Sequence, residues 1–279
     1  MSAVHHPPVR PAVVAHRGSS ADAPEHTLEA YQQALEDGAD ALECDVRLTA
    51  DGHLVCVHDR TLDRTGSTHG VVSTMTLQQL GDVDFGAWRS DLRGGQPMLE
   101  DEPLVVDERR HRILTLERLL ELVVDSEREI GLAIETKHPT RYAGLVEERV
   151  VQVLKRFGLA RPRSEHDQRI RVMSFSQLSA RRIRTMAPGL PTVFLMERVP
   201  LRFRNGSLPF GARIAGPSID IVREHPRFVE RAHTQGNEVH VWTVDEPADV
   251  DLCLRLGVDA IITNRPRMVA SRIDDALRA

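Results

Sequence analysis

Two acidic residues and a histidine lie on neighbouring extended segments of the chain, separated by a predicted turn. Glu43 and Asp45 occupy alternate positions of an apolar, strand-like run, so their carboxylates point to the same side and can hold one cation. Asp51 and Gly52 separate this run from a second apolar run that ends at His58, and this pattern predicts a β-hairpin. Two acids and a histidine on one face would begin a metal-assisted acid–base site.

The length of the hairpin loop decides which residues lie opposite each other. A two-residue loop places Asp45 opposite His58, whereas a four-residue loop places Glu43 there, and both loops preserve the same facing. In either case one face is expected to carry Glu43, Asp45, Arg47, Cys56 and His58. Cys44 and Val57 would lie on the other face, so the two cysteines of the hairpin are not expected to pair.

Other residues capable of chemistry follow apolar runs elsewhere in the chain. His16 and Arg17 follow the first such run, Glu135 and Lys137 occupy alternate positions around the end of a later one, and Trp242 lies in a still later one. Taken singly, a rim glutamate usually pairs with a nearby arginine, and a single histidine or tryptophan is usually explained by packing or solvation. Taken together, this set has no obvious purely structural purpose. Lys137 is one of only two lysines in a chain rich in arginine, which indicates a position where arginine would not serve.

Strand-like and helix-like segments alternate along the chain, which is typical of a parallel sheet. Helices are expected over residues 27–37, 116–124, 142–157, 176–186, 226–235, 247–256 and from 266 onward. Strands are expected over residues 13–15, 130–136, 170–174, 192–196, 213–215, 239–244 and 260–263, in addition to the hairpin within 41–58, whose second arm is 54–57.

The run 54–57 follows its predecessor too closely for a parallel crossover, so it must be an antiparallel hairpin arm. Removing it leaves eight parallel strands, and eight strand–helix units in a chain of this length predict a single TIM (β/α)8 barrel over residues 1–279. An open doubly wound sheet is the alternative, but its usual GxGxxG fingerprint is absent. The segment 59–113 breaks the alternation and is expected to be a partly ordered insertion that caps the strand ends.

Composition narrows the class of protein. The net charge of −5 argues against broad binding to nucleic acid or to anionic membranes. No run is apolar enough to span a membrane, and the first twelve residues lack the apolar stretch of a signal peptide. The three cysteines are an odd number without CxxC spacing, which fits a reducing cytoplasm. The expected partner is a small molecule; the sequence does not indicate an oligomeric state.

Short motifs that contain these residues resemble those of the glycerophosphodiester phosphodiesterases, in order from about Val13 to Pro266. They are His16-Arg17-Gly18, Pro24-Glu25-His26-Thr27, Glu43-Cys-Asp45, Asp51-Gly52, Val57-His58-Asp59, Glu135-Thr-Lys137, Ser174-Phe175, Val241-Trp242-Thr243 and Ile261-Ile262-Thr263-Asn264. The sequence departs from the family pattern at His26, where the family usually has Asn.

The resemblance implies a TIM barrel with a divalent cation. By resemblance, the metal ligands are Glu43, Asp45 and Glu135, the acid–base pair is His16 and His58, and the phosphate contacts are Arg17 and Lys137. Trp242 is a candidate substrate contact from its place in a late strand, with packing as the equal alternative. Three carboxylates suit Mg²⁺ or Ca²⁺ better than zinc. One histidine would take a proton from the nucleophile and the other would protonate the leaving alkoxide, but the sequence does not say which does which.

The expected reaction is the hydrolysis of glycerophosphodiesters to sn-glycerol 3-phosphate and an alcohol. The main alternative is a phosphodiesterase for phospholipid or lysophospholipid head groups, which an apolar ridge at the barrel mouth would favour, although none is evident in the sequence. A metal-dependent sugar isomerase would not obviously need paired histidines. A barrel that binds phosphodiesters without catalysis would not need the complete set of candidate catalytic residues.

Overall fold

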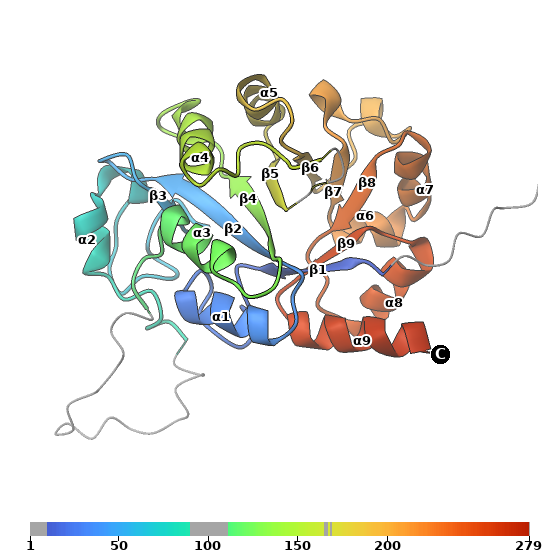
Figure 1. The fold of residues 1–279 in the computed structure, drawn as a ribbon, viewed down its shortest axis with the longest axis horizontal. Coiled ribbons are helices and arrows are strands. Elements are labelled where there is room, and N and C mark those ends of the chain that lie inside the picture. The colour runs from blue at the N-terminus through green and yellow to red at the C-terminus, as the bar shows by residue number, and fades with distance from the viewer. Residues whose placement is uncertain (1–9, 90–110, 165–166, 168, 279) are drawn as a thin grey trace, which may run out of the picture.

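The computed structural model describes residues 10–89, 111–164, 167 and 169–278. Its strands form one nine-stranded sheet in which β1 pairs with both β9 and β2, so the sheet closes on itself. The parallel strands are β1 (Ala12–His16), β2 (Ala41–Leu48), β4 (Gly131–Thr136), β5 (Ile170–Ser174), β6 (Thr192–Met196), β7 (Ile214–Pro217), β8 (Glu238–Val241) and β9 (Ala260–Thr263). The predicted TIM barrel is therefore confirmed, and Figure 1 shows its strands enclosed by helices.

Helices surround the barrel and connect successive strands (Figure 1). They are α1 (Leu28–Glu36), α3 (Leu116–Val124), α4 (Leu145–Arg156), α5 (Gln177–Met186), α6 (Ile219–Glu224), α7 (Arg227–Thr234), α8 (Pro247–Leu256) and α9 (Pro266–Arg278). Side-chain caps begin several of them: the Thr27 hydroxyl accepts the Ala30 N–H, and the Ser176 hydroxyl accepts the Ser179 N–H. Helix α6 was not predicted, because its six residues are too few to show a clear apolar period.

The interior of the barrel is filled by small and branched side chains. They are Val14, Ala41, Ala133, Met173, Val193, Leu195, Ile214, Ala260 and Ile262. Two larger apolar clusters lie between the sheet and the helices, one around β2 and β4 and the other around β8 and β9. The interior is thus a packed layer that supports whatever lies above it at the carboxyl ends of the strands.

The predicted hairpin exists, but its expected register is wrong. Strand β3 (Leu54–Cys56) runs antiparallel to β2 with Val46 opposite Cys56, so the connection at 49–53 has an odd number of residues. Side-chain hydrogen bonds explain the longer turn. The Thr49 hydroxyl donates to Asp51 Oδ1 at 2.6 Å and accepts the His53 N–H at 2.9 Å.

This register turns Cys56 away from the face that was predicted for it. Cys56 lies on the core side with Cys44 and Val46, and the thiols of Cys44 and Cys56 interact. The prediction that the two cysteines face opposite sides is therefore wrong, although both are free thiols. Val57 donates its N–H to the Asp45 carbonyl at 3.0 Å, after which the chain leaves the ladder. His58 thus reaches the strand ends as a loop residue rather than as a ladder partner.

The described part of the segment after the hairpin has its own local order. It contains a 3₁₀ turn, η1 (Val72–Thr74), and the short helix α2 (Leu77–Gly81). A separate apolar cluster joins it to β3; its buried members are Val55, Val57, Leu62, Val72, Leu80, Val83 and Phe85. Residues 90–110 of the predicted insertion lie outside the described residues. Two further 3₁₀ turns, η3 (Leu201–Phe203) and η4 (Pro209–Gly211), lie between β6 and β7.

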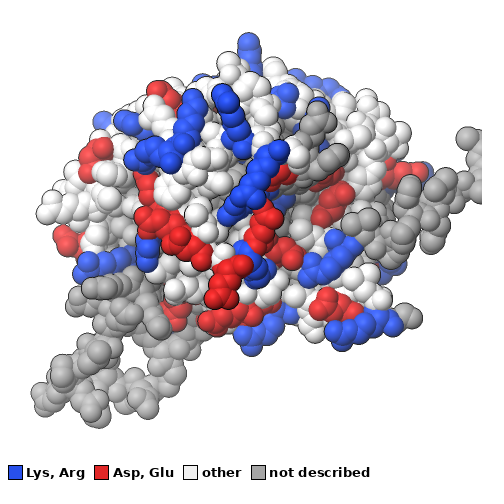
Figure 2. Space-filling view, in the orientation of Figure 1, with Lys and Arg blue, Asp and Glu red and all other residues white. Residues whose placement is uncertain are grey.

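Charged side chains of both signs occur on the face shown in Figure 2. Basic side chains gather in the upper part of that view, over α4 and α5, and acidic side chains gather nearer its centre. No helix in the described part of the chain is long and apolar enough to cross a membrane.

Two glycines with similar backbone conformation allow a test of packing beside the site. Gly18 (φ +85°) follows Arg17, and a Cβ added there would lie 2.6 Å from the Ala30 carbonyl carbon; Gly38 (φ +84°) has nothing within 4 Å. We expect Gly38→Ala to cost about 1–2 kcal/mol of unfolding free energy, for left-handed strain alone. Gly18→Ala should cost about 1–3 kcal/mol more, because the backbone must also move. Urea unfolding measures both, and equal losses would contradict the close approach.

Candidate active site

Alternation along the strands places polar residues above the apolar interior layer. His16, Glu43 and Glu135 each follow an interior residue of β1, β2 or β4 by two positions. The register places His16 beside Glu43 and Asp45 beside Glu135. The residues predicted from three separate segments are therefore brought together at the carboxyl ends of adjacent strands.

The three carboxylates form a compact buried cluster. Glu43, Asp45 and Glu135 each offer an oxygen, and these oxygens all lie within 4.8 Å of one another. The backbone N–H of Arg17 donates to Glu43 Oε2 at 3.1 Å, whereas the buried Glu43 Oε1 has no hydrogen-bond partner among the described residues. An unpaired buried carboxylate oxygen is costly, and a cation held by the cluster would satisfy it. The donor set, which consists only of oxygens, fits a hard divalent cation.

Positive groups surround Asp45. Lys137 Nζ lies 2.9 Å from Asp45 Oδ1 and 2.8 Å from Glu135 Oε1, and Arg17 Nε lies 3.0 Å from Asp45 Oδ2. Burial alone would raise the pKa of Asp45, but Lys137, the His26 hydrogen bond and Arg17 together hold it well below its usual range.

The pKa values of the other two acids shift in the opposite direction. Burial and the neighbouring charge of Asp45 raise the pKa of Glu135 to about 8, although Lys137 opposes the rise. Burial, with the charges of Asp45 and Glu135, also raises the pKa of Glu43. Asp45 is therefore the carboxylate of this cluster that is most firmly ionised.

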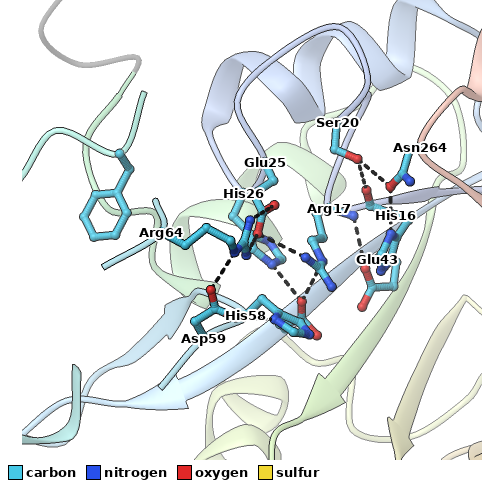
Figure 3. Close-up of polar contacts among 12 residues, drawn as sticks. His16, Arg17, Ser20, Glu25, His26, Glu43, His58, Asp59, Arg64 and Asn264 are labelled. Atoms are coloured by element: carbon cyan, nitrogen blue, oxygen red, sulfur yellow. Dashed lines mark hydrogen bonds and ion pairs between the residues drawn. The ribbon is translucent and has the colours of Figure 1, made fainter. Parts of the chain in front are cut away.

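His16 is held by an amide from the other end of the chain. His16 Nδ1 lies 2.8 Å from Asn264 Oδ1 (Figure 3). Asn264 Nδ2 in turn donates to Asp245 Oδ2 at 2.6 Å. An amide oxygen can only accept, so His16 Nδ1 carries the proton and the Nε2 lone pair remains available. Burial and the charge of Arg17 lower the pKa of His16 to about 3, which keeps the ring neutral.

His58 is held by a carboxylate instead. Its Nδ1 lies 2.7 Å from Asp59 Oδ1, and Arg64 Nε donates to Asp59 Oδ2 at 2.6 Å (Figure 3). Arg47 donates two hydrogen bonds to the His58 carbonyl, at 2.9 and 2.7 Å, and so fixes the turn that follows Val57. Burial lowers the pKa of His58, while Asp45 and the Asp59 hydrogen bond oppose that shift. As predicted, His58 lies near the acids without belonging to their cluster.

Arg17 and Trp242 occupy different sides of the barrel mouth. Arg17 adopts a left-handed backbone conformation (φ +59°) and pairs with Glu25 at 3.1 Å; Glu25 in turn accepts two hydrogen bonds from Arg64 at 2.7 Å. Trp242 follows β8 and is half-buried, its indole N–H donates to the Gly216 carbonyl at 2.7 Å, and its ring meets Phe175 edge-on at 5.3 Å. Trp242 therefore follows β8, whereas the acidic cluster lies on β2 and β4.

Comparison with known proteins identifies the family. A model of the glycerophosphoryl diester phosphodiesterase family matches residues 16–268. The chain belongs to that family. It is 46% identical, over 95% of its length and 93% of the relative's, to a protein of Mycobacterium tuberculosis named probable glycerophosphodiester phosphodiesterase 1. It is 31% identical, over 94% of its length and 97% of the relative's, to a glycerophosphodiester phosphodiesterase of Caldanaerobacter subterraneus.

Solved structures agree with this family. A glycerophosphodiester phosphodiesterase from Agrobacterium tumefaciens superposes with a TM-score of 0.71 at 26% identity, covering 94% of this chain and 99% of that one. A phosphodiesterase from Oleispira antarctica, solved with the product sn-glycerol-3-phosphate, superposes with a TM-score of 0.74 at 23% identity, covering 95% and 97%. The predicted resemblance to this family of phosphodiester hydrolases, and the TIM barrel, are confirmed.

Several residues that support this phosphodiesterase site were not assigned a role from sequence. Glu25, His26, Asp59 and Asn264 belong to the motifs that carry the family resemblance, so a signal for them existed. Arg64 showed no such signal, because it acts through Glu25 and Asp59 rather than through a motif of its own.

A cavity of about 1160 Å³ does not coincide with this site. It lies at the opposite end of the barrel, beside the carboxyl ends of α4 and α5. The converging polar groups, rather than a large cavity, mark the candidate site.

The two lysines of the chain allow a test of the charge balance. Lys137 is buried between two acids, whereas Lys155 is exposed on α4. With a chelator present, Lys137→Met should lower the unfolding free energy by about 3–5 kcal/mol, because it leaves buried carboxylates without their cation. Lys155→Met should change it by less than about 0.5 kcal/mol. Urea denaturation at pH 8 measures both, and a small effect at Lys137 would mean that the acids do not depend on it.

Proposed function

We propose that the chain is a metal-dependent phosphodiesterase that hydrolyses glycerophosphodiesters to sn-glycerol 3-phosphate and an alcohol. The observation that most strongly supports this function is the buried cluster of Glu43, Asp45 and Glu135 at the barrel mouth. His16 and His58 flank it (Figure 3), as an acid–base pair at a phosphate would require. Family membership supports the same reaction class.

We propose that Glu43, Asp45 and Glu135 hold one Mg²⁺ or Ca²⁺. When bound, such a cation would neutralise charge on a phosphate oxygen and help to activate a hydroxyl or water. The unpartnered Glu43 Oε1 and the all-oxygen donor set support this choice.

We propose that His16 accepts the proton of the nucleophile and that His58 protonates the leaving oxygen. The amide of Asn264 holds the neutral tautomer of His16 with its Nε2 lone pair available. The carboxylate of Asp59 instead accepts a hydrogen bond from His58 Nδ1 and opposes the lowering of the His58 pKa by burial, which suits a proton donor.

Arg17 and Lys137 would offset the charge that develops on the phosphate. Both already lie within 3.0 Å of Asp45, so a phosphate at the cluster would meet them without a large movement. Trp242, on the other side of the mouth, would contact the organic part of the substrate. Its indole N–H is already bonded, so this contact would use the ring face.

We propose that residues 1–279 form a single catalytic domain and that segment 59–113 caps part of the mouth. The Arg64 hydrogen bonds to Glu25 and Asp59 support this role for the insertion. We propose a small-molecule partner, no nucleic acid and a cytoplasmic location. The acidic net charge and the three buried free thiols support these assignments.

Chelation tests the metal. EDTA should abolish the release of glycerol 3-phosphate from glycerophosphocholine, followed with glycerol-3-phosphate dehydrogenase, and Mg²⁺ or Ca²⁺ should restore it, because the cation completes the charge balance of the site. Glu43→Gln should not be restored, whereas Glu148→Gln, at an exposed position on α4, should behave as wild type. Full turnover by a verified metal-free preparation would refute the proposed metal dependence. A folded, metal-bound chain that turns over no glycerophosphodiester would refute the proposed enzymatic activity.

Leaving-group dependence tests the histidines. His16→Ala and His58→Ala should each lower kcat on glycerophosphocholine by about 10²–10⁴, and the double variant should lose little more. With a p-nitrophenyl leaving group, which needs no proton, only His58→Ala should recover most of its rate. His53→Ala, in the exposed hairpin loop, is the control. Recovery by His16→Ala instead would reverse the assignment of the two roles.

A second substrate class has one structural observation in its favour. Exposed apolar side chains follow β5 and β6 at the barrel mouth: Phe175 (40% exposed), Leu178 (56%) and Leu201 (78%). A hydrogen bond of 2.5 Å between Arg202 and Gln177 joins their two loops. Such a ridge, which was not evident in the sequence, would suit a lysophospholipid. If the chain hydrolyses lysophosphatidylcholine, and the rate falls in Leu201→Ser but not in Leu277→Ser, this substrate class is supported. If the wild-type chain does not hydrolyse lysophosphatidylcholine, this class is excluded.

A further inference from the structure

His26 occupies an unusual place beside the proposed metal site. It stands where the family usually has Asn, it is only 6% exposed, and its backbone is left-handed (φ +61°). We propose that His26 is a positioning residue that holds Asp45 in the orientation needed for cation binding. This inference rests on the proposed function.

Each ring nitrogen of His26 has one fixed partner. Nε2 lies 2.9 Å from Asp45 Oδ2, and Nδ1 lies 2.8 Å from the Tyr31 hydroxyl. The Tyr31 hydroxyl in turn lies 3.0 Å from the Glu43 carbonyl oxygen. The contacts thus run from one proposed ligand, through two buried side chains, to the backbone of another.

The groups involved decide the direction of the hydrogen bonds at Glu43 and Asp45. The Tyr31 hydroxyl donates to the Glu43 carbonyl, because a carbonyl oxygen can only accept. The direction of the hydrogen bond between the Tyr31 hydroxyl and His26 Nδ1 depends on the tautomer of the ring. The firmly ionised Asp45 accepts the bond from Nε2, because a carboxylate has no proton to donate. The ring of His26 is therefore held between Asp45 and Tyr31, and turning it over would break both hydrogen bonds.

The consequence for Asp45 is a fixed carboxylate plane. His26 and Arg17 both hold Oδ2, which leaves Oδ1 directed at the cluster, where Lys137 joins it to Glu135. Hydrogen bonds from outside the ligand set orient ligating carboxylates, and their loss typically weakens metal binding about 10–100-fold.

Asn could replace only part of this arrangement. It tolerates a left-handed backbone and could donate one bond to Asp45. Its short side chain carries a single amide and does not span the distance between Asp45 and Tyr31. In this chain, therefore, His26 joins the ligand to Tyr31, and Asn should give partial rather than full support.

The test is direct titration of the full-length, chelator-treated protein with Mg²⁺ or Ca²⁺ alone, monitored by isothermal titration calorimetry. His26→Ala should weaken the Kd about 10–100-fold, and His26→Asn should lie between it and wild type. Tyr31→Phe should weaken binding in wild type but not further in His26→Ala, because Tyr31 acts through His26. His233→Asn, at a surface histidine paired with Asp259, should leave the Kd unchanged.

The outcomes separate this inference from the proposed metal site. If wild type binds the cation, Asp45→Asn does not, and folded His26→Ala binds as tightly as wild type, the positioning role is overturned while the metal site stands. If wild type binds neither cation, both fall. His26→Asn retains a polar side chain in the same backbone conformation, so it serves where His26→Ala does not fold, and full wild-type affinity in His26→Asn would overturn the proposed advantage of histidine.

Discussion

Three carboxylates buried within reach of one another repel, and the residues around them are arranged to offset that repulsion. Lys137 lies between Asp45 and Glu135, and Arg17 adds a second cation at Asp45. The offset is unequal, because the pKa of Asp45 is lowered while those of Glu43 and Glu135 are raised. One firmly ionised carboxylate would therefore be available to attract a cation, and the other two would gain most if a cation joined them.

Strands and loops make different contributions to this site. The acids lie on β2 and β4, whose pairing within the barrel fixes their separation. The partners that set the proton positions of the histidines come from loops: Asn264 follows β9, and Asp59 follows the hairpin arm. Rigid strands suit ligands that must share one ion, whereas loops can bring hydrogen-bond partners from distant segments.

Much of the fold could be predicted because it depends on local periodicity. Alternating strand and helix patterns, with caps such as Thr27 and Ser176, indicated the parallel strands of the barrel and most of its helices. The hairpin register could not be predicted in the same way. It depends on whether Thr49 closes the turn through its hydroxyl, and Asp-Gly alone does not decide that.

The same difference between regular strands and irregular loops decided which candidate site residues could be placed from the sequence. His16, Glu43, Asp45 and Glu135 could be placed together because strand alternation and parallel pairing determine where they lie. The bond between His16 and Asn264 joins residues 248 positions apart, so no local pattern can reveal it. His58 reached the site despite the slipped register, because two hydrogen bonds from Arg47 turn the chain after the ladder ends. A ladder fixes facing only as far as its last pair; beyond that pair, side-chain contacts with the loop backbone determine where a functional group points.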